Sequence, residues 1–272
     1  MTKLSIVTVC YNDLNGLKKT VNSVGFERKL CGDDVEYIIV DGFSTDGTKA
    51  YLDEVANSVS LIISEPDKGL YDAMNKGAKV ANGKFILYMN AGDYFESGAL
   101  VKVLENLKEN KFYFFRSKII SEDSMLTWYF PNDSISSINI DSWLKRNGPN
   151  LQSCCFPYDF YKKNLFDANF KVSADMAYIG EALVQCSYQF VDLVCGNFFL
   201  GGVSNTYNKF SVVLIHAKEA VDVNRRYYSQ GRSVLLESFF TYSRFITKYL
   251  VIKILGVRVL RSITRFKNRI FS

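Results

Sequence analysis

Histidine is almost missing from this chain of 272 residues, which contains only His216. A single histidine argues against a zinc site built from histidines and against a catalytic triad that needs one. None of the six cysteines has the C-x-x-C spacing, and the chain begins with Met1-Thr2-Lys3 directly before a strand. We therefore expect no signal peptide, a reduced cytosolic compartment and cysteines that pack as small core residues. A redox-active Cys154-Cys155 pair is the alternative.

Long apolar runs and a generally basic composition are also lacking. No uncharged run approaches the roughly 20 residues that a membrane-spanning helix needs. Residues 241–272 contain eight Lys or Arg and no acid, whereas residues 1–240 carry 25 basic and 28 acidic residues. The net charge of +5 therefore belongs to the C-terminal segment. This distribution argues against nucleic acid as a partner and indicates a tail that binds a surface.

Strand-like and helix-like segments alternate over the first 110 residues. Strands are expected at 4–10, 35–41, 60–64 and 84–90, with an amphipathic helix after each. This alternation predicts an α/β fold with a parallel sheet covered by helices, whose ligands lie at the C-terminal ends of the strands. After residue 111 we expect antiparallel strands, a helix at about 140–146, another over 173–186 and a strand-like stretch from 188. Residues from 209 onward look helical.

Two expected strands end in acidic residues. Asp41 follows the strand in "YIIVDGFSTDGT", where its carboxylate could accept hydrogen bonds from a nucleobase or a ribose. A plain strand, turn and capped helix explains it equally well. The buried run 85–89 leads into Asn90-Ala91-Gly92-Asp93, where a carboxylate suits Mg²⁺ or Mn²⁺ bound to phosphates. An ordinary β-turn is the alternative.

A cluster of polar residues opens the third expected helix, in "SEPDKGLYDAMNKGAKVANG" (64–83). Its i, i+3 and i+4 spacing puts several of these residues on one face, which either binds a ligand or is solvated. Gly77 favours close packing or a ligand, because a glycine inside a helix costs about 1 kcal/mol relative to alanine. The candidate residues are Asp67, Lys68, Tyr71, Asp72, Asn75 and Lys76.

The order of four motifs is more specific than any one of them. "SIVTVCYN", "IIVDGFSTDGT", "SEPDKGLYDAMNKG" and "GKFILYMNAGD" follow one another, and neither a P-loop nor a G-x-G-x-x-G is present. Together the motifs resemble family 2 glycosyltransferases, especially bacterial enzymes of surface-polysaccharide synthesis. The resemblance covers about residues 4–205 and is strongest over 4–98.

The resemblance implies an A-type glycosyltransferase fold and a nucleotide-sugar donor, with UDP as the expected nucleotide. Residues 1–205 would be the catalytic domain, with a donor half (1–110) and an acceptor half (111–205), followed by a helical appendage (206–272). Asp93 would hold the Mn²⁺ or Mg²⁺. The implied nucleotide-sugar-binding residues are Thr8, Tyr11, Asn12, Asp41, Ser44, Asp67, Lys68, Tyr71, Asp72, Asn75, Asn90, Ala91 and Gly92.

The resemblance also implies an acceptor side within residues 149–178. Gln152 occupies a position that the family often writes as His-Gln, and Asp175 falls in the region of the catalytic base. Gly201 and Gly202 are assigned to the acceptor side as well. Without the resemblance, Asp175 is equally well explained as a helix cap or a surface acid. The implied reaction is an inverting transfer to a saccharide acceptor, expected to be linked to a polyprenyl lipid.

Three residues depart from the family pattern: Phe43 replaces a frequent Gly, Leu151 a frequent His, and Asn90 the first Asp of the metal motif. The last of these puts strict dependence on a metal in doubt. Two other functions stay open. A nucleotidyltransferase also uses a parallel sheet and a metal, although "VCYNDLNG" is not the Gly-rich basic loop such enzymes carry. A non-catalytic subunit that binds nucleotide or saccharide is the other.

The C-terminal segment 241–272 combines apolar residues at helical spacing with eight interleaved cations. A basic amphipathic helix of this kind can lie in an anionic membrane surface. The sequence therefore predicts a peripheral protein at the inner face of a bacterial cell membrane. The alternative is that the apolar stripe packs on the catalytic body or on a second copy in a homodimer, because periodicity alone does not distinguish these partners.

Overall fold

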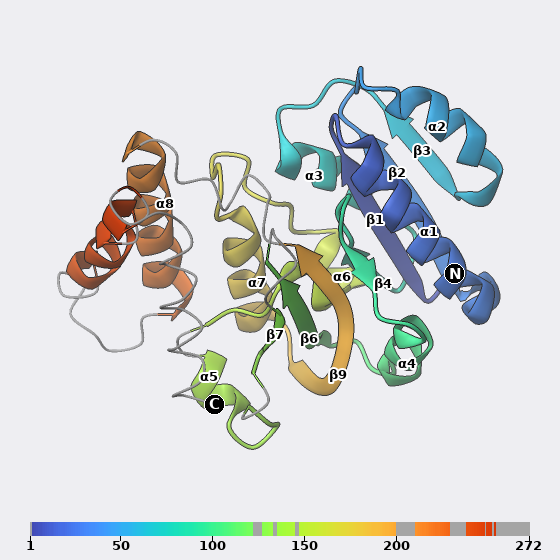
Figure 1. Cartoon of the computed structure of the whole chain (residues 1–272). Coiled ribbons are helices and arrows are strands. Elements are labelled where there is room, and N and C mark those ends of the chain that lie inside the picture. Colours follow the sequence, from blue (N-terminus) through green and yellow to red (C-terminus); the bar gives the residue numbers. More distant parts are fainter. Residues whose placement is uncertain are drawn as a thin grey trace.

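The protein was analysed as a computed structural model, which describes residues 2–121, 127–132, 135–144, 147–199, 210–228, 238–247, 249–251 and 253. Figure 1 shows a central sheet with helices on both faces and a helical C-terminal part beside it. Most of the basic amphipathic segment, together with Gly201 and Gly202, falls outside the described residues. Within the described part, no helix is both long and apolar enough to cross a bilayer.

Among the described residues, nine strands form one mixed sheet with the order β3-β2-β1-β4-β8-β6-β9-β5, and β7 pairs with β6. The first four in space are parallel, and Leu4–Cys10 pairs in register with Val35–Asp41. They are β1 (Leu4–Cys10), β2 (Val35–Asp41), β3 (Leu61–Ser64) and β4 (Phe85–Tyr88). The parallel sheet predicted for residues 1–110 is therefore confirmed.

The remaining strands extend this sheet with mixed directions. β4 pairs antiparallel with β8, β8 antiparallel with β6, and β6 parallel with β9. The antiparallel pairing of β6 with β7 was expected from the sequence, whereas β8 was not. These strands are β5 (Tyr94–Phe95), β6 (Phe112–Ile120), β7 (Thr127–Phe130), β8 (Cys154–Pro157) and β9 (Tyr188–Phe199).

Alternate residues of each central strand face two separate cores. In β1, Leu4 and Ile6 pack with α1 (Leu14–Cys31), α2 (Thr48–Val55) and α4 (Ala99–Asn106). Val7 and Val9 pack on the other face with α3 (Leu70–Val80). A strand buried on both faces reads as a continuous apolar run, which explains why the sequence shows so little alternation here. All six cysteines are free thiols, and burial raises the pKa of Cys154 and Cys155, as expected for core residues.

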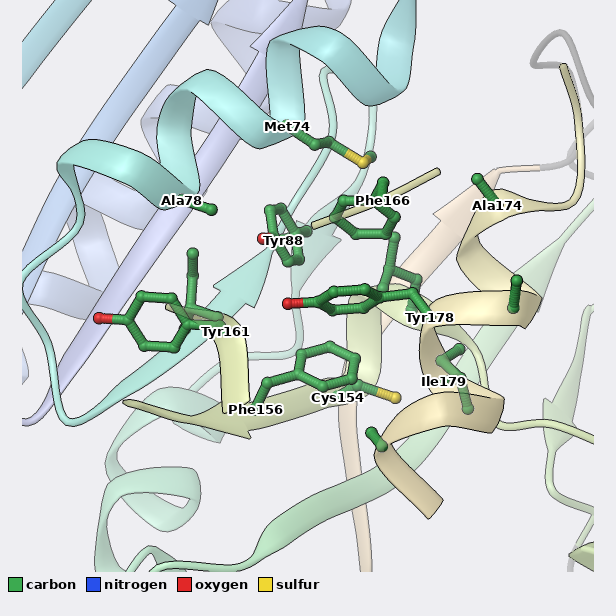
Figure 2. Packing of buried hydrophobic residues seen from close by; sticks show 14 of the residues in the cluster. Met74, Ala78, Tyr88, Cys154, Phe156, Tyr161, Phe166, Ala174, Tyr178 and Ile179 are labelled. Atoms are coloured by element: carbon green, nitrogen blue, oxygen red, sulfur yellow. The ribbon is translucent and has the colours of Figure 1, made fainter. Parts of the chain in front are cut away.

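Aromatic side chains join the two halves of the chain on the α3 face. Figure 2 shows the Phe166 ring beside Met74 of α3 and the Tyr178 ring of α7 (Ala174–Gln185). The ring centroids of Phe166 and Tyr178 are 4.1 Å apart in a stacked arrangement, and Tyr88 of β4 meets Phe166 edge-on. These contacts fix α7 relative to α3. The Tyr71 hydroxyl of α3 also donates to Asp175 of α7, which lies 104 residues further along the chain.

The remaining helices and single helical turns complete the fold. α8 packs against α7 on the side away from β1–β4 (Figure 1), and Val223 and Tyr228 belong to the same apolar cluster as Tyr178. The elements are the 3-10 turns Gly32–Asp34, Ala56–Ser58 and η3 (Leu151–Ser153), the helices α5 (Ile140–Leu144), α6 (Tyr158–Tyr161) and α8 (Phe210–Val223), and the π-helical turn η5 (Asn224–Tyr228).

Candidate active site

The loops after β1 and β2 are joined by hydrogen bonds at the C-terminal edge of the sheet. The backbone N–H of Asn12 donates to Oγ of Ser44 over 2.8 Å, and the backbone N–H of Thr45 donates to the side-chain Oδ1 of Asn12 over 2.8 Å. Asn12 itself lies in the left-handed region at φ 50°, which asparagine tolerates better than most residues. Two of the predicted nucleotide-binding residues thus shape each other's loops.

Gly42 lies next to the side chains of Asp67 and Tyr11, two of the predicted nucleotide-binding residues. A Cβ atom there would come within 2.4 Å of Oδ2 of Asp67 and 3.1 Å of the Tyr11 ring, so any larger residue would have to displace these side chains. Tyr11 is 66% exposed, and Phe43 is 56% exposed with φ 67°. The left-handed backbone at Phe43 explains why glycine is frequent in the family at this position. Two exposed aromatic rings therefore flank Gly42.

Thr8 and Asp41, two predicted nucleotide-binding residues, have side chains that are not exposed at the surface. The side chain of Thr8 is fully buried and accepts a hydrogen bond from the Tyr37 hydroxyl over 3.1 Å. Asp41 is also fully buried, and its carboxylate accepts from the hydroxyls of Ser44 (2.5 Å) and Ser64 (2.7 Å). In this arrangement Asp41 organises the loop that presents Ser44, and its predicted contact with a base or ribose stays a prediction.

The loop before α3 is also tightly folded. Gly69 has φ 118°, its N–H donates to Asp67, and the N–H of Lys68 donates to Asp72 over 3.0 Å. The Lys68 side chain is exposed. Gly77 packs against β1, because a Cβ there would lie 2.4 Å from Val7. The packing explanation for this mid-helix glycine is the one that the structure supports.

Two residues predicted to face a ligand from α3 are used inside the protein. Asn75 is buried and exchanges two hydrogen bonds with the backbone of Phe166, at 2.9 and 2.8 Å. Lys76 pairs with Glu65 at 2.9 Å and donates to the carbonyl of Pro66 at 2.7 Å. Both therefore hold α3 to neighbouring segments, and their predicted contact with the nucleotide-sugar stays a prediction.

The turn Asn90–Asp93 is held by a residue that sequence reasoning did not single out. Thr20 of α1 is fully buried, and its hydroxyl donates to the carbonyl of Asp93 over 2.6 Å. The same oxygen accepts from the N–H of Gly92 over 3.0 Å, and Gly92 has φ 95°. A threonine inside an otherwise apolar helix face is the signal that could have found it.

The carboxylate of Asp93 points into the protein. Asp93 is 4% exposed, its Oδ1 accepts from the backbone N–H of Phe199 over 3.0 Å, and Gln152 also donates to it. Burial raises the pKa of Asp93 to about 7, although the hydrogen bonds from Phe199 and Gln152 and the charge of Lys19 oppose this shift. The structure thus brings Asp93 and the predicted acceptor-side residue Gln152 together.

In this arrangement Asp93 does not fit the predicted role of metal ligand. Its carboxylate is buried and accepts hydrogen bonds from Phe199 and Gln152, whereas Mg²⁺ and Mn²⁺ need accessible oxygen ligands. Within the described residues, no group of three or more His, Cys, Asp or Glu could hold an ion. Asn90 contributes one buried amide oxygen that has no partner in that part of the chain. We therefore derive no catalytic step through a metal.

Asp175 lies in a different environment, at the start of α7. It is half-buried, and its Oδ1 accepts from the N–H of Met176 over 2.8 Å and from the Tyr71 hydroxyl over 3.4 Å. Desolvation raises the pKa of Asp175 to about 6, the two hydrogen bonds lower it, and the nearby charge of Glu219 raises it. Because Tyr71 lies in the first turn of α3, this carboxylate is joined to the helix that follows the loop with Asp67 and Lys68.

A family model described as glycosyl transferase family 2 matches residues 5–169. The chain belongs to glycosyl transferase family 2. An uncharacterized glycosyltransferase of Mycobacterium tuberculosis is 28% identical over 242 residues, which cover 85% of this chain and 87% of that protein. A PGL/p-HBAD biosynthesis glycosyltransferase of Mycobacterium bovis is 30% identical over 196 residues, 66% of this chain and 71% of that one.

Solved structures confirm the predicted A-type glycosyltransferase fold. Residues 1–349 of Staphylococcus aureus TarS in complex with UDP-GlcNAc match with a TM-score of 0.62 and 14% identity, over 93% of this chain and 73% of that one. The chain spans 44% of the longer TarS chain that it also matches. A mannosyltransferase from Pyrobaculum calidifontis in complex with GDP-Man and Mn²⁺ matches with a TM-score of 0.57 and 12% identity. The match covers 97% of this chain and 80% of that one.

Proposed function

We propose that this glycosyltransferase moves a sugar from a UDP-sugar to a saccharide acceptor with inversion at the anomeric carbon. The observation that carries the proposal is the half-buried Asp175 carboxylate beside Tyr71, on the helix that continues from the loop with Asp67 and Lys68. A base near the donor loops is what an inverting transfer needs. The UDP-GlcNAc bound by TarS supports UDP as the nucleotide.

In this proposal Asp175 takes the proton of the acceptor hydroxyl as its oxygen forms a bond to the anomeric carbon. The bond from that carbon to the diphosphate breaks on the opposite side, and UDP leaves. A base whose pKa lies near the working pH is effective, and the pKa of about 6 for Asp175 meets this condition. The exposed Lys68 and the N-terminus of α3 would place positive charge near the departing diphosphate.

The donor pocket in this proposal lies between the loops after β1 and β2. The exposed ring of Tyr11, the Asn12–Ser44 pair and Asp67 would surround the nucleoside, with Phe43 at the rim. Thr8 and Asp41 would act from behind, by fixing the loops. Gln152 would lie between the donor and the acceptor through its contact with Asp93.

We further propose that the acceptor belongs to bacterial surface glycoconjugate synthesis and is linked to a lipid. The support comes from relatives, one of which is a PGL/p-HBAD biosynthesis glycosyltransferase. Another, from Bacillus subtilis, is a putative teichuronic acid biosynthesis glycosyltransferase, 29% identical over 109 residues. The basic segment 241–272 would bind the anionic inner membrane face, where such an acceptor is presented.

Release of UDP tests the donor assignment and separates the alternatives. The protein is incubated with UDP-glucose, UDP-galactose and UDP-N-acetylglucosamine, each with and without Mn²⁺ and with a saccharide acceptor mixture. Acceptor-dependent release of UDP that is lost in Asp175→Asn supports the proposal. Release of pyrophosphate from UTP and a sugar phosphate would instead indicate a nucleotidyltransferase. Binding of UDP with no turnover on any donor would favour a non-catalytic subunit.

Sedimentation with anionic vesicles tests the membrane assignment separately. The full chain should pellet with vesicles that contain phosphatidylglycerol and should do so less at high salt, because screening weakens the attraction of the cations. A chain shortened to end at Glu237 should stay in the supernatant. Equal sedimentation of both chains would reject the membrane role, and a shift in mass on gel filtration upon shortening would favour a homodimer.

A further inference from the structure

A buried glutamate of α8 holds the loop that leads into α7. Glu219 is 8% exposed, and its carboxylate accepts hydrogen bonds from three consecutive backbone N–H groups. Oε1 accepts from Lys171 over 2.8 Å, and Oε2 accepts from Val172 over 2.9 Å and Ser173 over 3.0 Å. Three amides converging on one carboxylate restrict the backbone of this loop much more than a single hydrogen bond would.

The held loop determines where α7 begins. Ser173 is the N-cap residue and makes no side-chain capping hydrogen bond, and its own N–H is held by Glu219, so this glutamate ties down the residue at which α7 starts. Asp175 is the second residue of α7, two positions after the last amide that Glu219 binds. A shift of this loop would therefore move the Asp175 carboxylate away from Tyr71.

The charge of Glu219 also acts on the predicted base. No Lys or Arg forms an ion pair with Glu219 among the described residues, so its negative charge is balanced only by amide dipoles. The ionisable groups that face Asp175 are Tyr71 from α3, Cys154 from β8, Tyr228 from η5 and Glu219 from α8. Of these, Glu219 is the only carboxylate, and it raises the pKa of Asp175.

We propose that Glu219 is a positioning residue that sets the place and the charge environment of Asp175 through the backbone of residues 171–173. The inference rests on the proposed role of Asp175 as the base. It assigns to α8, which lies in the segment expected to be a separate appendage, a direct part in building the acceptor side. Burying a carboxylate in a helix whose other inward residues are mostly apolar is costly, and the three amides offset that cost.

Glu219→Gln tests this role, because it keeps the size of the side chain but turns an amide NH₂ group toward the backbone donors. Asp222→Asn is the matched control: it removes the same charge from the same helix, and Asp222 accepts no hydrogen bond from residues 171–173 in the described structure. The measurements are kcat and KM for the best UDP-sugar, the pH profile of kcat, affinity for UDP by calorimetry, and amide hydrogen exchange.

For Glu219→Gln we expect kcat to fall at least tenfold, affinity for UDP to stay within twofold, and exchange at residues 171–173 to accelerate. The acid limb of kcat should move to lower pH, since a negative charge near Asp175 has been removed. Asp222→Asn should match the wild-type protein in all four measurements. Should Glu219→Gln not fold, Glu219→Asp is measured instead, because its shorter carboxylate does not reach all three amides. The same fall in kcat and the same faster exchange at residues 171–173 are then expected, with the acid limb near its wild-type position because the negative charge is kept.

Two results would overturn the positioning role of Glu219, and only one of them would also overturn the proposed role of Asp175 as the base. A wild-type kcat and acid limb in the Glu219 variant, with Asp175→Asn inactive, would reject the positioning role and leave the proposed function intact. Full activity of Asp175→Asn would reject the proposed base and the positioning role together.

Discussion

The surroundings of Asp93 and Asp175 differ in access more than in polarity. Burial raises the pKa of both carboxyls, to about 7 and about 6. Asp93 is nearly enclosed, and its partners are the Phe199 amide and Gln152. Asp175 remains half-buried, with Tyr71 as its side-chain partner. A raised pKa therefore identifies a desolvated acid, and the exposure of the side chain distinguishes an acid that could act as a base from one that only holds other parts of the protein together.

This comparison changes the role expected for the strand-end motif. From the sequence, Asp93 is expected to hold a metal ion at the end of a buried strand, and Asp175 is expected to be the base or else a helix cap or surface acid. The structure places the Asp93 carboxylate between β9 and η3, where it stabilises the turn that Thr20 also holds. Five predictions test the contrast, from the largest expected effect to the smallest.

Asp175→Asn should lower kcat by about 10²–10⁴-fold and leave affinity for UDP within about twofold, because the amide keeps the shape and loses the basicity. Steady-state UDP release and calorimetry measure the two quantities. Asp159→Asn, an exposed acid on α6, is the control and should behave as the wild-type protein. A parallel loss of UDP affinity and kcat in the Asp175 variant would indicate a binding or structural role.

Asp93→Ala should lower the free energy of unfolding by about 2–4 kcal/mol, because the Phe199 amide and Gln152 are left buried without their acceptor. Urea denaturation measures this change. Asp93→Asn should lose less, since its carbonyl oxygen can still accept from Phe199. Loss of transfer at unchanged stability, together with loss of a response to Mn²⁺, would instead support Asp93 as a metal ligand.

The stability of the protein should depend on the ionisation of Asp175. Its pKa rises from an ordinary 3.8 to about 6 on folding. The folded state thus binds the proton more tightly, so this contribution to stability is complete below about pH 4 and is lost as the pH rises through 6. Between pH 4 and 7 the wild-type protein should lose up to about 3 kcal/mol relative to Asp175→Asn. Parallel pH curves for the two proteins would contradict the assigned environment.

The same ionisation predicts that kcat rises with pH and reaches half of its plateau near pH 6, since the base must be unprotonated.

Thr20→Val should cost about 1–2 kcal/mol of stability, because the valine keeps the shape but removes the hydroxyl that binds the turn at Gly92 and Asp93. Thermal unfolding measures the loss. Ser23→Ala is the control, because it loses only the hydrogen bond that the Ser23 hydroxyl accepts from the N–H of Phe95. This control should cost less stability than Thr20→Val. Equal losses would remove the special role of Thr20.

Much of the fold could be predicted because it depends on local patterns. Continuous apolar runs such as 37–40 indicate strands buried on both faces, and the strand that contains this run appears as predicted. The motif order led to the family that the comparisons confirm. β8 and η3 were missed, since Cys154–Pro157 is too short to show a period and pairs with strands distant in sequence.

The sequence by itself determined which loops gather at the C-terminal edge of the sheet, since strand polarity and helix caps are encoded within a few residues. Only the tertiary structure decided that Asp93 points inward and that Asn75 binds the Phe166 backbone. It alone brought Glu219 to an amide 46 residues away. The reason is that side-chain direction depends on long-range partners, which local periodicity does not encode.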